Sequence, residues 1–571
     1  MKRLSLRGCC ILLLLGAFIA GAQAAGPPPS KYYRKPGRVD ITVQPAPASI
    51  LWDRDVTVTV RDGTRLSVNV YRPLGTGRYP VIMSASWYGK DNFGDAQYRE
   101  WADQSGSDVG RMTISDIVPF GAPDPAFWVP RGYIVVHADV RGAFKSEGNL
   151  GPNTPQDALD YFDLIEWAGT QPWSTGKVGL SGVSYLAYSQ WFAAALRPPH
   201  LAAIMPWEGL VDHYRDNVVH GGIPETNFRV KSFRKYVEQR RNKNFDLAED
   251  YPAMLKEHPL FDSYWEQKAA KVEDITVPAL ICASWSAQGN HTRGSLEGFR
   301  RIGSKDKWLV THGRNEWPMY YDPEMQAMQA KFFDYFLQGK KNGMAEEPRV
   351  RLELRTTRDE YVVRRASQWP IENTQYTSLY LNATNNTLEM NTPTVMSNAQ
   401  YESNDGGSVK FEYRFDRETW VAGNMNLKLW VSADVGTDLD LFVGVRKLDR
   451  EGQEVYFYGF GGQPNSVVAR GWLRASARSK DEMRSTPDRP FLRHTRVEKV
   501  KPGDVVPVEV EILPSGTVFE AGSRLQLVIQ GEDVVPDRVM VHGSSVNRGV
   551  HRVYTGGGTA SQLLIPVIPR S

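Results

Sequence analysis

A serine on a predicted tight turn is the residue of this chain best placed to act as a nucleophile. Ser184 follows the run Gly179-Leu180-Ser181-Gly182-Val183, and 185–196 after it has the apolar spacing of a helix. A strand–turn–helix connection strains the serine backbone and exposes its hydroxyl, and Gly182 keeps the turn free of a clashing Cβ. Leu186 replaces the second small residue of the common five-residue motif. The short motif by itself therefore fits a helix-capping serine as well as it fits a nucleophile.

The elements that must position Ser184 alternate between apolar strands and helices. The hairpin predicted at 56–60 and 66–71 turns at Asp62-Gly63. Buried strands are then expected at 80–83, 133–138, 177–180, 201–205, 277–283 and 307–311, with helices such as 156–168 and 185–196 between them. This alternation predicts an α/β domain with a parallel sheet covered on both faces.

Two long segments depart from this alternation of strands and helices. Residues 206–274 are charged and helical in spacing, for example at 233–241 and 247–258, and we interpret them as a helical cap over the strand ends. From 348 to 571 short strands divided by Gly, Asn and Asp turns recur at 410–415, 427–432, 439–445, 505–513, 525–529 and 563–567. They predict an all-β sandwich of jelly-roll type.

The N-terminus has the features of a secretory signal peptide. Lys2, Arg3 and Arg7 precede an apolar run, and Ala22-Gln23-Ala24 fits the cleavage rule, so we expect residues 1–24 to be removed and the protein to be secreted or periplasmic. The remainder has 65 Lys and Arg against 65 Asp and Glu, which argues against nucleic acid or an anionic membrane as a partner. One cysteine remains, Cys282, and we interpret it as a small core hydrophobe.

Several motifs resemble one family of serine hydrolases over nearly the whole mature chain. Gly-Val-Ser-Tyr-Leu-Ala-Tyr-Ser-Gln-Trp (182–191) is similar to the nucleophile segment of the cocaine esterase and X-prolyl dipeptidyl-peptidase family, which includes alpha-amino-acid ester hydrolases and glutaryl-cephalosporin acylases. Asp139-Val-Arg-Gly with Ser146-Glu-Gly, Gln171-Pro-Trp, Gly176-Lys-Val-Gly, Gly471-Trp-Leu-Arg-Ala-Ser and Pro502-Gly-Asp-Val-Val fit its other segments, with Phe144 in place of a Gly. The resemblance implies an α/β-hydrolase domain in two parts, 25–205 and 275–347, around the cap.

The same resemblance assigns two oxyanion donors. Ser86-Trp87-Tyr88-Gly89-Lys90 matches the family loop that supplies a tyrosine hydroxyl, and the second donor is the backbone N–H after the nucleophile. Tyr88 and Tyr185 are therefore expected to hold the oxyanion of a tetrahedral intermediate. The competing interpretation of Tyr88 is an aromatic packed at a strand end.

The general base is expected to be a histidine after Ser184 at a strand end, because this fold orders its triad as nucleophile, acid and histidine. Among ten histidines, His312 directly follows 307–311, the last strand predicted for the α/β domain, and we predict it as the base. His291 lies in the loop after 277–283, where the family carries its acid. The sequence has His312-Gly-Arg-Asn-Glu-Trp where relatives carry Gly-Pro-Trp-x-His.

The acid is missing from its expected place. The family has Trp-x-Asp after 277–283, whereas this chain has Trp285-Ser286-Ala287. Three interpretations remain open: Glu208 or Asp212, after the preceding strand, replaces the acid; Gln288, Asn290 or a backbone carbonyl orients the histidine; or hydrolysis is weak or lost. For Glu208 and Asp212 a structural role at the cap entrance is the competing interpretation.

The resulting prediction is an exported serine hydrolase that cleaves small acyl esters or amides through an acyl-enzyme on Ser184, with no cofactor and no metal. The alternatives are an X-prolyl dipeptidyl-peptidase-like aminopeptidase, in which Glu208 would hold the substrate amine, and a catalytically weakened or non-catalytic binding protein on the same scaffold. The expected partner is a small-molecule ester or amide. The sequence does not indicate the oligomeric state.

Overall fold

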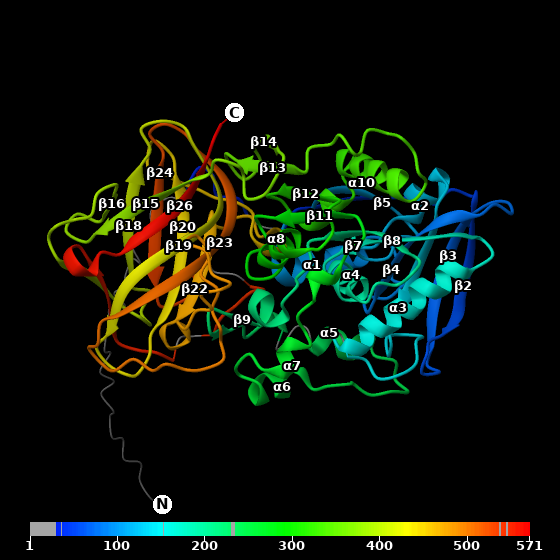
Figure 1. The fold of residues 1–571 in the computed structure, drawn as a ribbon, viewed down its shortest axis with the longest axis horizontal. Coiled ribbons are helices and arrows are strands. Elements are labelled where there is room, and N and C mark those ends of the chain that lie inside the picture. The colour runs from blue at the N-terminus through cyan, green and yellow to red at the C-terminus, as the bar shows by residue number, and fades with distance from the viewer. Residues whose placement is uncertain are drawn as a thin grey trace, which may run out of the picture.

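The computed structural model describes residues 30–35, 37–151, 153–229, 234–535, 538–543 and 546–570. The predicted signal peptide, 1–24, lies outside the described residues. Within the described part of the chain, no helix has the length and apolar character needed to span a bilayer. The chain forms an α/β part and a β-rich C-terminal part, which lie side by side in Figure 1.

The α/β part is built on one long sheet. Its hydrogen-bonded order is β2-β3-β6-β4-β7-β8-β11-β12-β13-β14, and every pair from β6 to β13 is parallel. The strands are β2 (Ile50–Thr59), β3 (Arg65–Pro73), β4 (Tyr79–Ser86), β6 (Ile134–Asp139), β7 (Ser174–Val183), β8 (Leu201–Trp207), β11 (Ala279–Ser284), β12 (Lys307–His312), β13 (Val350–Arg355) and β14 (Tyr361–Ala366). The predicted hairpin and all six predicted buried strands are confirmed. A separate parallel pair, β1 (Val39–Gln44) with β5 (Gly110–Ser115), was not predicted.

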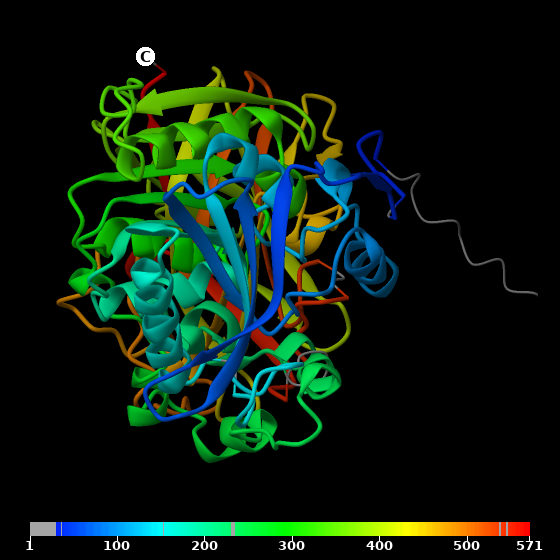
Figure 2. The ribbon, with the colours of Figure 1, turned by 90° about the vertical axis from the view of Figure 1, so that its right-hand side faces the viewer.

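Helices cover both faces of this sheet, because its strands are apolar on both sides. They are α1 (Ala96–Ser105), α2 (Pro125–Trp128), α3 (Pro155–Thr170), α4 (Tyr185–Ala195), α8 (Thr292–Arg301), α9 (Glu316–Tyr320) and α10 (Pro323–Phe336). Leu164 of α3, Trp191 of α4 and Phe299 of α8 pack in the core of one face. Trp128 of α2 and Phe333 of α10 pack in the core of the other. Figure 2 looks onto the end of this part that carries β2 and β3, coloured blue.

The predicted cap region contains short elements rather than long helices. They are a π-helical turn at Tyr214–Val218, β9 (Val219–His220), β10 (Ile223–Pro224), α5 (Arg234–Arg240), α6 (Tyr251–Glu257), α7 (Ser263–Glu266) and a 3₁₀ turn at Val272–Asp274. In Figure 1 the helices α5, α6 and α7 lie below the junction of the two large parts.

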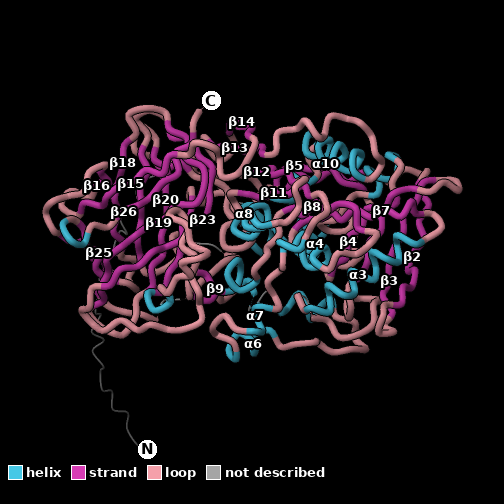
Figure 3. The backbone as a smooth tube through the Cα atoms, in the orientation of Figure 1, coloured by secondary structure: helices cyan, strands magenta, loops and turns pink. Residues whose placement is uncertain are grey.

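The C-terminal part consists almost entirely of strands, as the tube in Figure 3 shows. They are β15 (Gln375–Asn382), β16 (Thr387–Glu389), β17 (Ser397–Glu402), β18 (Ser408–Arg414), β19 (Thr419–Ala433), β20 (Asp440–Leu448), β21 (Glu454–Val455), β22 (Ala469–Arg474), β23 (Val506–Phe519), β24 (Arg524–Gln530), β25 (Val550–Thr555) and β26 (Gln562–Ile568). Leu525, Leu527 and Ile529 of β24 are fully buried, and their period of two directs one strand face into the core. All six predicted C-terminal strands are confirmed.

The boundary between the two parts differs from the predicted one at residue 348. β13 and β14 lie beyond it in the sequence, yet β13 pairs with β12 and extends the first sheet. Val350, Leu352 and Leu354 pack in the core of the α/β part, which explains this placement. β13 also makes one bridge to β23, at Arg355 and Thr517, so the two parts share a hydrogen-bonded contact.

Candidate active site

Ser184 occupies the strained turn that its position predicts. It follows the last residue of β7, directly precedes α4, and has φ 63° and ψ −116°. A positive φ in a residue with a Cβ is uncommon and is typical of functional turns. A Cβ on Gly182, whose φ is 141°, would lie 2.6 Å from the Leu186 Cβ, so the turn requires glycine there. Leu186 thus packs against the space that Gly182 leaves.

Tyr88 and the backbone N–H of Tyr185 lie together next to Ser184. The Tyr88 hydroxyl donates to Ser184 Oγ at 3.3 Å. The backbone N–H of Tyr185 donates to the Tyr88 hydroxyl oxygen. Burial raises the pKa of Tyr88, so its hydroxyl stays protonated and can donate. The structure therefore brings together the two predicted oxyanion donors and the predicted nucleophile.

His291, and not His312, is the histidine beside Ser184. Its Nε2 lies 3.2 Å from Ser184 Oγ, within the reach expected of a general base. His291 ends the loop after β11 and directly precedes α8. Burial, and then the charge of Arg229, lower the pKa of His291 to about 3, so the ring is neutral at pH 7. A neutral ring is the form that accepts a proton.

Asn290 fixes the protonation form of that ring. The Asn217 amide donates to Asn290 Oδ1, which leaves the Asn290 Nδ2 to donate to His291 Nε2 at 2.9 Å. A nitrogen that accepts from Asn290 carries no proton of its own, so the neutral ring holds its proton on Nδ1. The unprotonated Nε2 is also the nitrogen that faces Ser184 Oγ, so the Asn290 amide and the serine hydroxyl share its lone pair.

The prediction of His312 as the base is wrong in geometry. His312 is the last residue of β12, paired in register with Ser284 of β11, and it is fully buried. Its Nδ1 accepts from the backbone N–H of Arg314 at 3.2 Å, and its Nε2 lies 2.7 Å from Glu208 Oε1. The ring therefore remains within the sheet layer and makes no hydrogen bond to Ser184.

Neither predicted replacement for the acid contacts His291. Glu208 is fully buried, lies beside His312 and accepts from the Ser284 hydroxyl. Burial raises its pKa to about 8 and lowers that of His312 to about 3, so the two form a neutral pair at pH 7. Asp212 forms an ion pair with Arg215 at 2.7 Å. Both carboxyl groups have structural partners, as the competing interpretation proposed.

No carboxylate occupies the position of the family's acid. Ala287 is fully buried against Phe460, and its carbonyl accepts from the backbone N–H of His291 at 2.9 Å, not from the ring. His291 Nδ1 is buried and has no hydrogen-bond partner within the described part of the chain. Of the open interpretations, the geometry matches a serine–histidine pair oriented by Asn290.

The sequence motifs did not single out Glu316, whose carboxyl group lies near Ser184. Glu316, at the start of α9, lines the same cavity as Ser184, and one of its oxygens is buried with no hydrogen-bond partner among the described residues. Burial, and then the nearby Glu208, raise its pKa well above the ordinary value. Burial thus favours the neutral form of Glu316. Glu316 lies in the loop after β12, where relatives carry a histidine, and this position in the sequence could have indicated that it lies near the site.

Ser184 opens into a cavity lined mainly by aromatic side chains. Its walls come from three regions of the chain: the α/β part, the 206–274 segment and the C-terminal part. The aromatic members are Trp87, Tyr88, Trp101, Phe120, Tyr185, Tyr188, Phe228, Tyr236, Trp317 and Phe460. Its ionisable members other than tyrosine are Glu100, Arg229, Arg240 and Glu316. This lining suits an apolar or aromatic group with a few polar contacts.

The described residues include no cluster of three or more His, Cys, Asp or Glu side chains that could hold a metal ion. Cys282 is fully buried in β11, and burial raises its pKa well above the ordinary value, so it is a core residue in this structure.

Comparisons with known proteins show which family the chain belongs to. Residues 62–314 match the family described as X-Pro dipeptidyl-peptidase (S15 family), and 342–564 match X-Pro dipeptidyl-peptidase C-terminal non-catalytic domain. A solved CocE/NonD family hydrolase from Staphylococcus aureus is 43% identical with a TM-score of 0.87, over 91% of this chain and 94% of that one.

Two curated relatives are more distant. A cocaine esterase from Rhodococcus sp. is 29% identical over 57% of this chain and 62% of its own length. A putative Xaa-Pro dipeptidyl-peptidase from Bacillus anthracis is 22% identical over 83% of this chain and 81% of its own length. The resemblance that the sequence motifs indicate is confirmed: the chain belongs to the CocE/NonD hydrolases, in the serine-hydrolase family of esterases and X-Pro dipeptidyl-peptidases.

Proposed function

We propose that this protein is an exported serine hydrolase that cleaves small esters or amides through an acyl-enzyme on Ser184, with His291 as its general base. The observation that carries this proposal is the convergence on Ser184 Oγ of His291 Nε2 at 3.2 Å and the Tyr88 hydroxyl at 3.3 Å. Export is supported by the sequence of residues 1–24, and a periplasmic or secreted location follows from it.

The reaction proceeds in two balanced steps. Ser184 Oγ forms a bond to the substrate carbonyl carbon while His291 Nε2 takes the serine proton, and the carbonyl oxygen becomes an oxyanion held by Tyr88 and the Tyr185 N–H. Collapse of this intermediate breaks the bond to the leaving alcohol or amine, which receives the proton from His291. Water repeats the sequence on the acyl-enzyme, releases the acid and restores Ser184.

The cavity supports small substrates with an apolar or aromatic group. Phe228 and Tyr236 of the 206–274 segment and Phe460 of the C-terminal part face the same space as Ser184. We propose that the 206–274 segment acts as a cap and that substrate enters between it and a C-terminal jelly roll. Glu208, considered above as the anchor for a peptide amine, is fully buried beside His312, which removes that support for a dipeptidyl-peptidase.

A non-catalytic binding protein is the second candidate, and the unpartnered Nδ1 of His291 favours it. A fluorophosphonate probe distinguishes the two, because only an activated serine reacts with it. We expect labelling of the wild type, none in Ser184→Ala, and full labelling in Ser181→Ala, whose hydroxyl is buried against Tyr320 at 2.7 Å. A wild type that neither labels nor turns over p-nitrophenyl phenylacetate would establish the binding protein instead.

A further inference from the structure

The loop that carries the base is attached to the C-terminal part of the protein. We call residues 287–292 the base segment. Gln288 within it donates from Nε2 to the Val468 carbonyl at 3.2 Å, and its Oε1 accepts from the Arg470 N–H at 2.7 Å. The Arg470 guanidinium donates back to the Gln288 carbonyl at 3.0 Å. Three hydrogen bonds thus join this loop to β22 and the residue before it.

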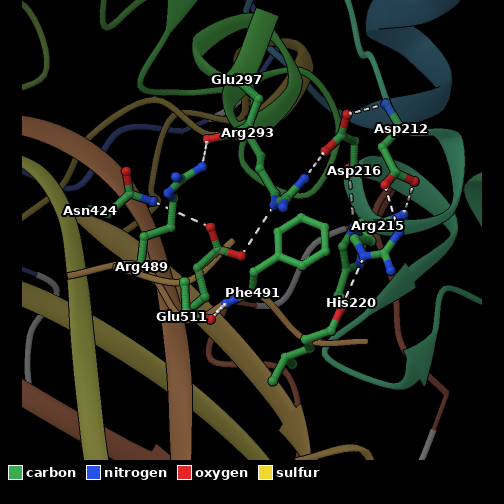
Figure 4. A network of polar contacts seen from close by, with 12 residues as sticks. Asp212, Arg215, Asp216, His220, Arg293, Glu297, Asn424, Arg489, Phe491 and Glu511 are labelled. Carbon is green, nitrogen blue, oxygen red and sulfur yellow. Dashed lines mark hydrogen bonds and ion pairs between the residues drawn. The ribbon is translucent and has the colours of Figure 1, made fainter. Parts of the chain in front are cut away.

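A buried arginine makes a second attachment just after the base segment. Arg293, in the first turn of α8, lies between Asp216 at 2.7 Å and Glu511 of β23 at 3.1 Å, as Figure 4 shows. The side chains of Arg293, Asp216 and Glu511 are 8%, 0% and 15% exposed. Opposite charges buried in this way have well-defined geometry, because each must satisfy its partners without water.

Asp216 is also connected to His291, through the turn that contains Asn217. Asp216 accepts from the backbone N–H groups of Val211 and Asp212, both at 2.9 Å, which fixes the π-helical turn at Tyr214–Val218. Asn217 in that turn donates to Asn290, which in turn donates to His291 Nε2. Arg293 therefore connects β23 both to the helix that follows His291 and to the turn that orients its ring.

We infer that the C-terminal part, which the family comparison describes as non-catalytic, positions His291 against Ser184 through Gln288, Arg293 and Glu511. The inference rests on the proposed role of His291. The three side chains are positioning residues, since none of them lines the cavity of Ser184. A base displaced by about 1 Å costs about 10²-fold in rate, so a modest shift of the loop has a measurable effect.

The test replaces Glu511 and compares it with a neighbour on the same strand. Glu509 lies two residues earlier on β23, so its side chain leaves the same face, and it pairs with Lys480 of the C-terminal part at 2.5 Å. Glu511→Gln and the control Glu509→Gln are made in the full chain, each in the wild-type background and with His291→Gln. Turnover of p-nitrophenyl acetate gives kcat and KM, and thermal unfolding confirms that each variant folds.

We expect Glu511→Gln to lower kcat by about 10-fold or more with KM within about twofold, and Glu509→Gln to change neither by more than about twofold. In the His291→Gln background Glu511→Gln should have no further effect, because it acts through a base that is absent. An equal loss in both backgrounds, or none in the wild-type background, would overturn the inference.

The same cycle separates this inference from the proposed function. Wild-type turnover in His291→Gln would refute the assignment of the base, and the positioning role with it. Loss in His291→Gln together with wild-type behaviour of Glu511→Gln would refute the positioning role alone. If Glu511→Gln does not fold, Gln288→Met is tested in its place, with and without His291→Gln, because Gln288 forms the other attachment to the C-terminal part. A kcat of Gln288→Met within about twofold of wild type would also overturn the inference.

Discussion

Replacing His291 with glutamine should remove most of the activity while leaving the fold intact. The ring is 1% exposed and packs edge-to-face on Phe460, with ring centroids 5.7 Å apart, so a side chain of similar length avoids a large cavity. Its Nε2 is 3.2 Å from Ser184 Oγ, and loss of a base in such contact lowers the rate by about 10²- to 10⁴-fold. This range equals about 2.7 to 5.4 kcal/mol of lost transition-state stabilisation.

The matched variant is His312→Gln, at the histidine that sequence reasoning favours. Burial keeps both His312 and Glu208 neutral at pH 7, so its loss removes a contact between neutral buried groups. We expect a stability loss of about 1 to 3 kcal/mol, seen as a lower Tm, with kcat per folded molecule nearly unchanged. Near-wild-type kcat in His291→Gln with a collapse in His312→Gln would refute the assignment of the base.

The pH profile of the wild type tests the same reasoning. A base acts only when it is unprotonated, and burial lowers the pKa of His291 to about 3 from an ordinary value near 6.5. The acid limb of kcat/KM should therefore shift downward, leaving a flat profile from pH 8 to about 5. A limb between about pH 6 and 7 would contradict this expectation, because it would show that a carboxylate partners His291 in the working enzyme.

Three further outcomes follow from the site. Tyr88→Phe removes an oxyanion donor and should lower kcat about 10²- to 10³-fold with little change in KM, whereas Tyr161→Phe, outside the cavity, should not; equal kinetics of the two would contradict the assignment. Glu316→Gln should change kcat by less than about threefold, because burial raises the pKa of this carboxyl and favours its neutral form; a larger loss would show that an ionised Glu316 is needed. Burial raises the pKa of Glu208 to about 8, so the folded protein keeps a proton that the unfolded chain has released, and stability falls as pH rises through 8. Thermal unfolding from pH 6.5 to 8.5, a range above the ordinary pKa of His312, should show that Glu208→Gln flattens this fall; parallel curves would refute it.

Local sequence patterns determined the framework and one side of the active site. Apolar runs specify the buried strands β4, β6, β7, β8, β11 and β12, because burial on both faces requires continuous apolar residues. Ser184 and Tyr185 follow directly from the turn between β7 and α4, whose geometry depends on a few adjacent residues. Tyr88 is close to such a local feature, since it lies just beyond β4.

Only the tertiary structure decided which histidine serves the serine and how it is held. His291 and His312 both lie close to strand ends, so their positions in the sequence do not separate them. His312 is still within β12, level with Ser284, and its ring stays in the sheet layer beside Trp207. His291 reaches Ser184 because the loop after β11 rises above the sheet and is attached to β22 and β23, more than 170 residues further along the chain. Contacts of that separation depend on how the two parts pack, which short sequence motifs do not encode.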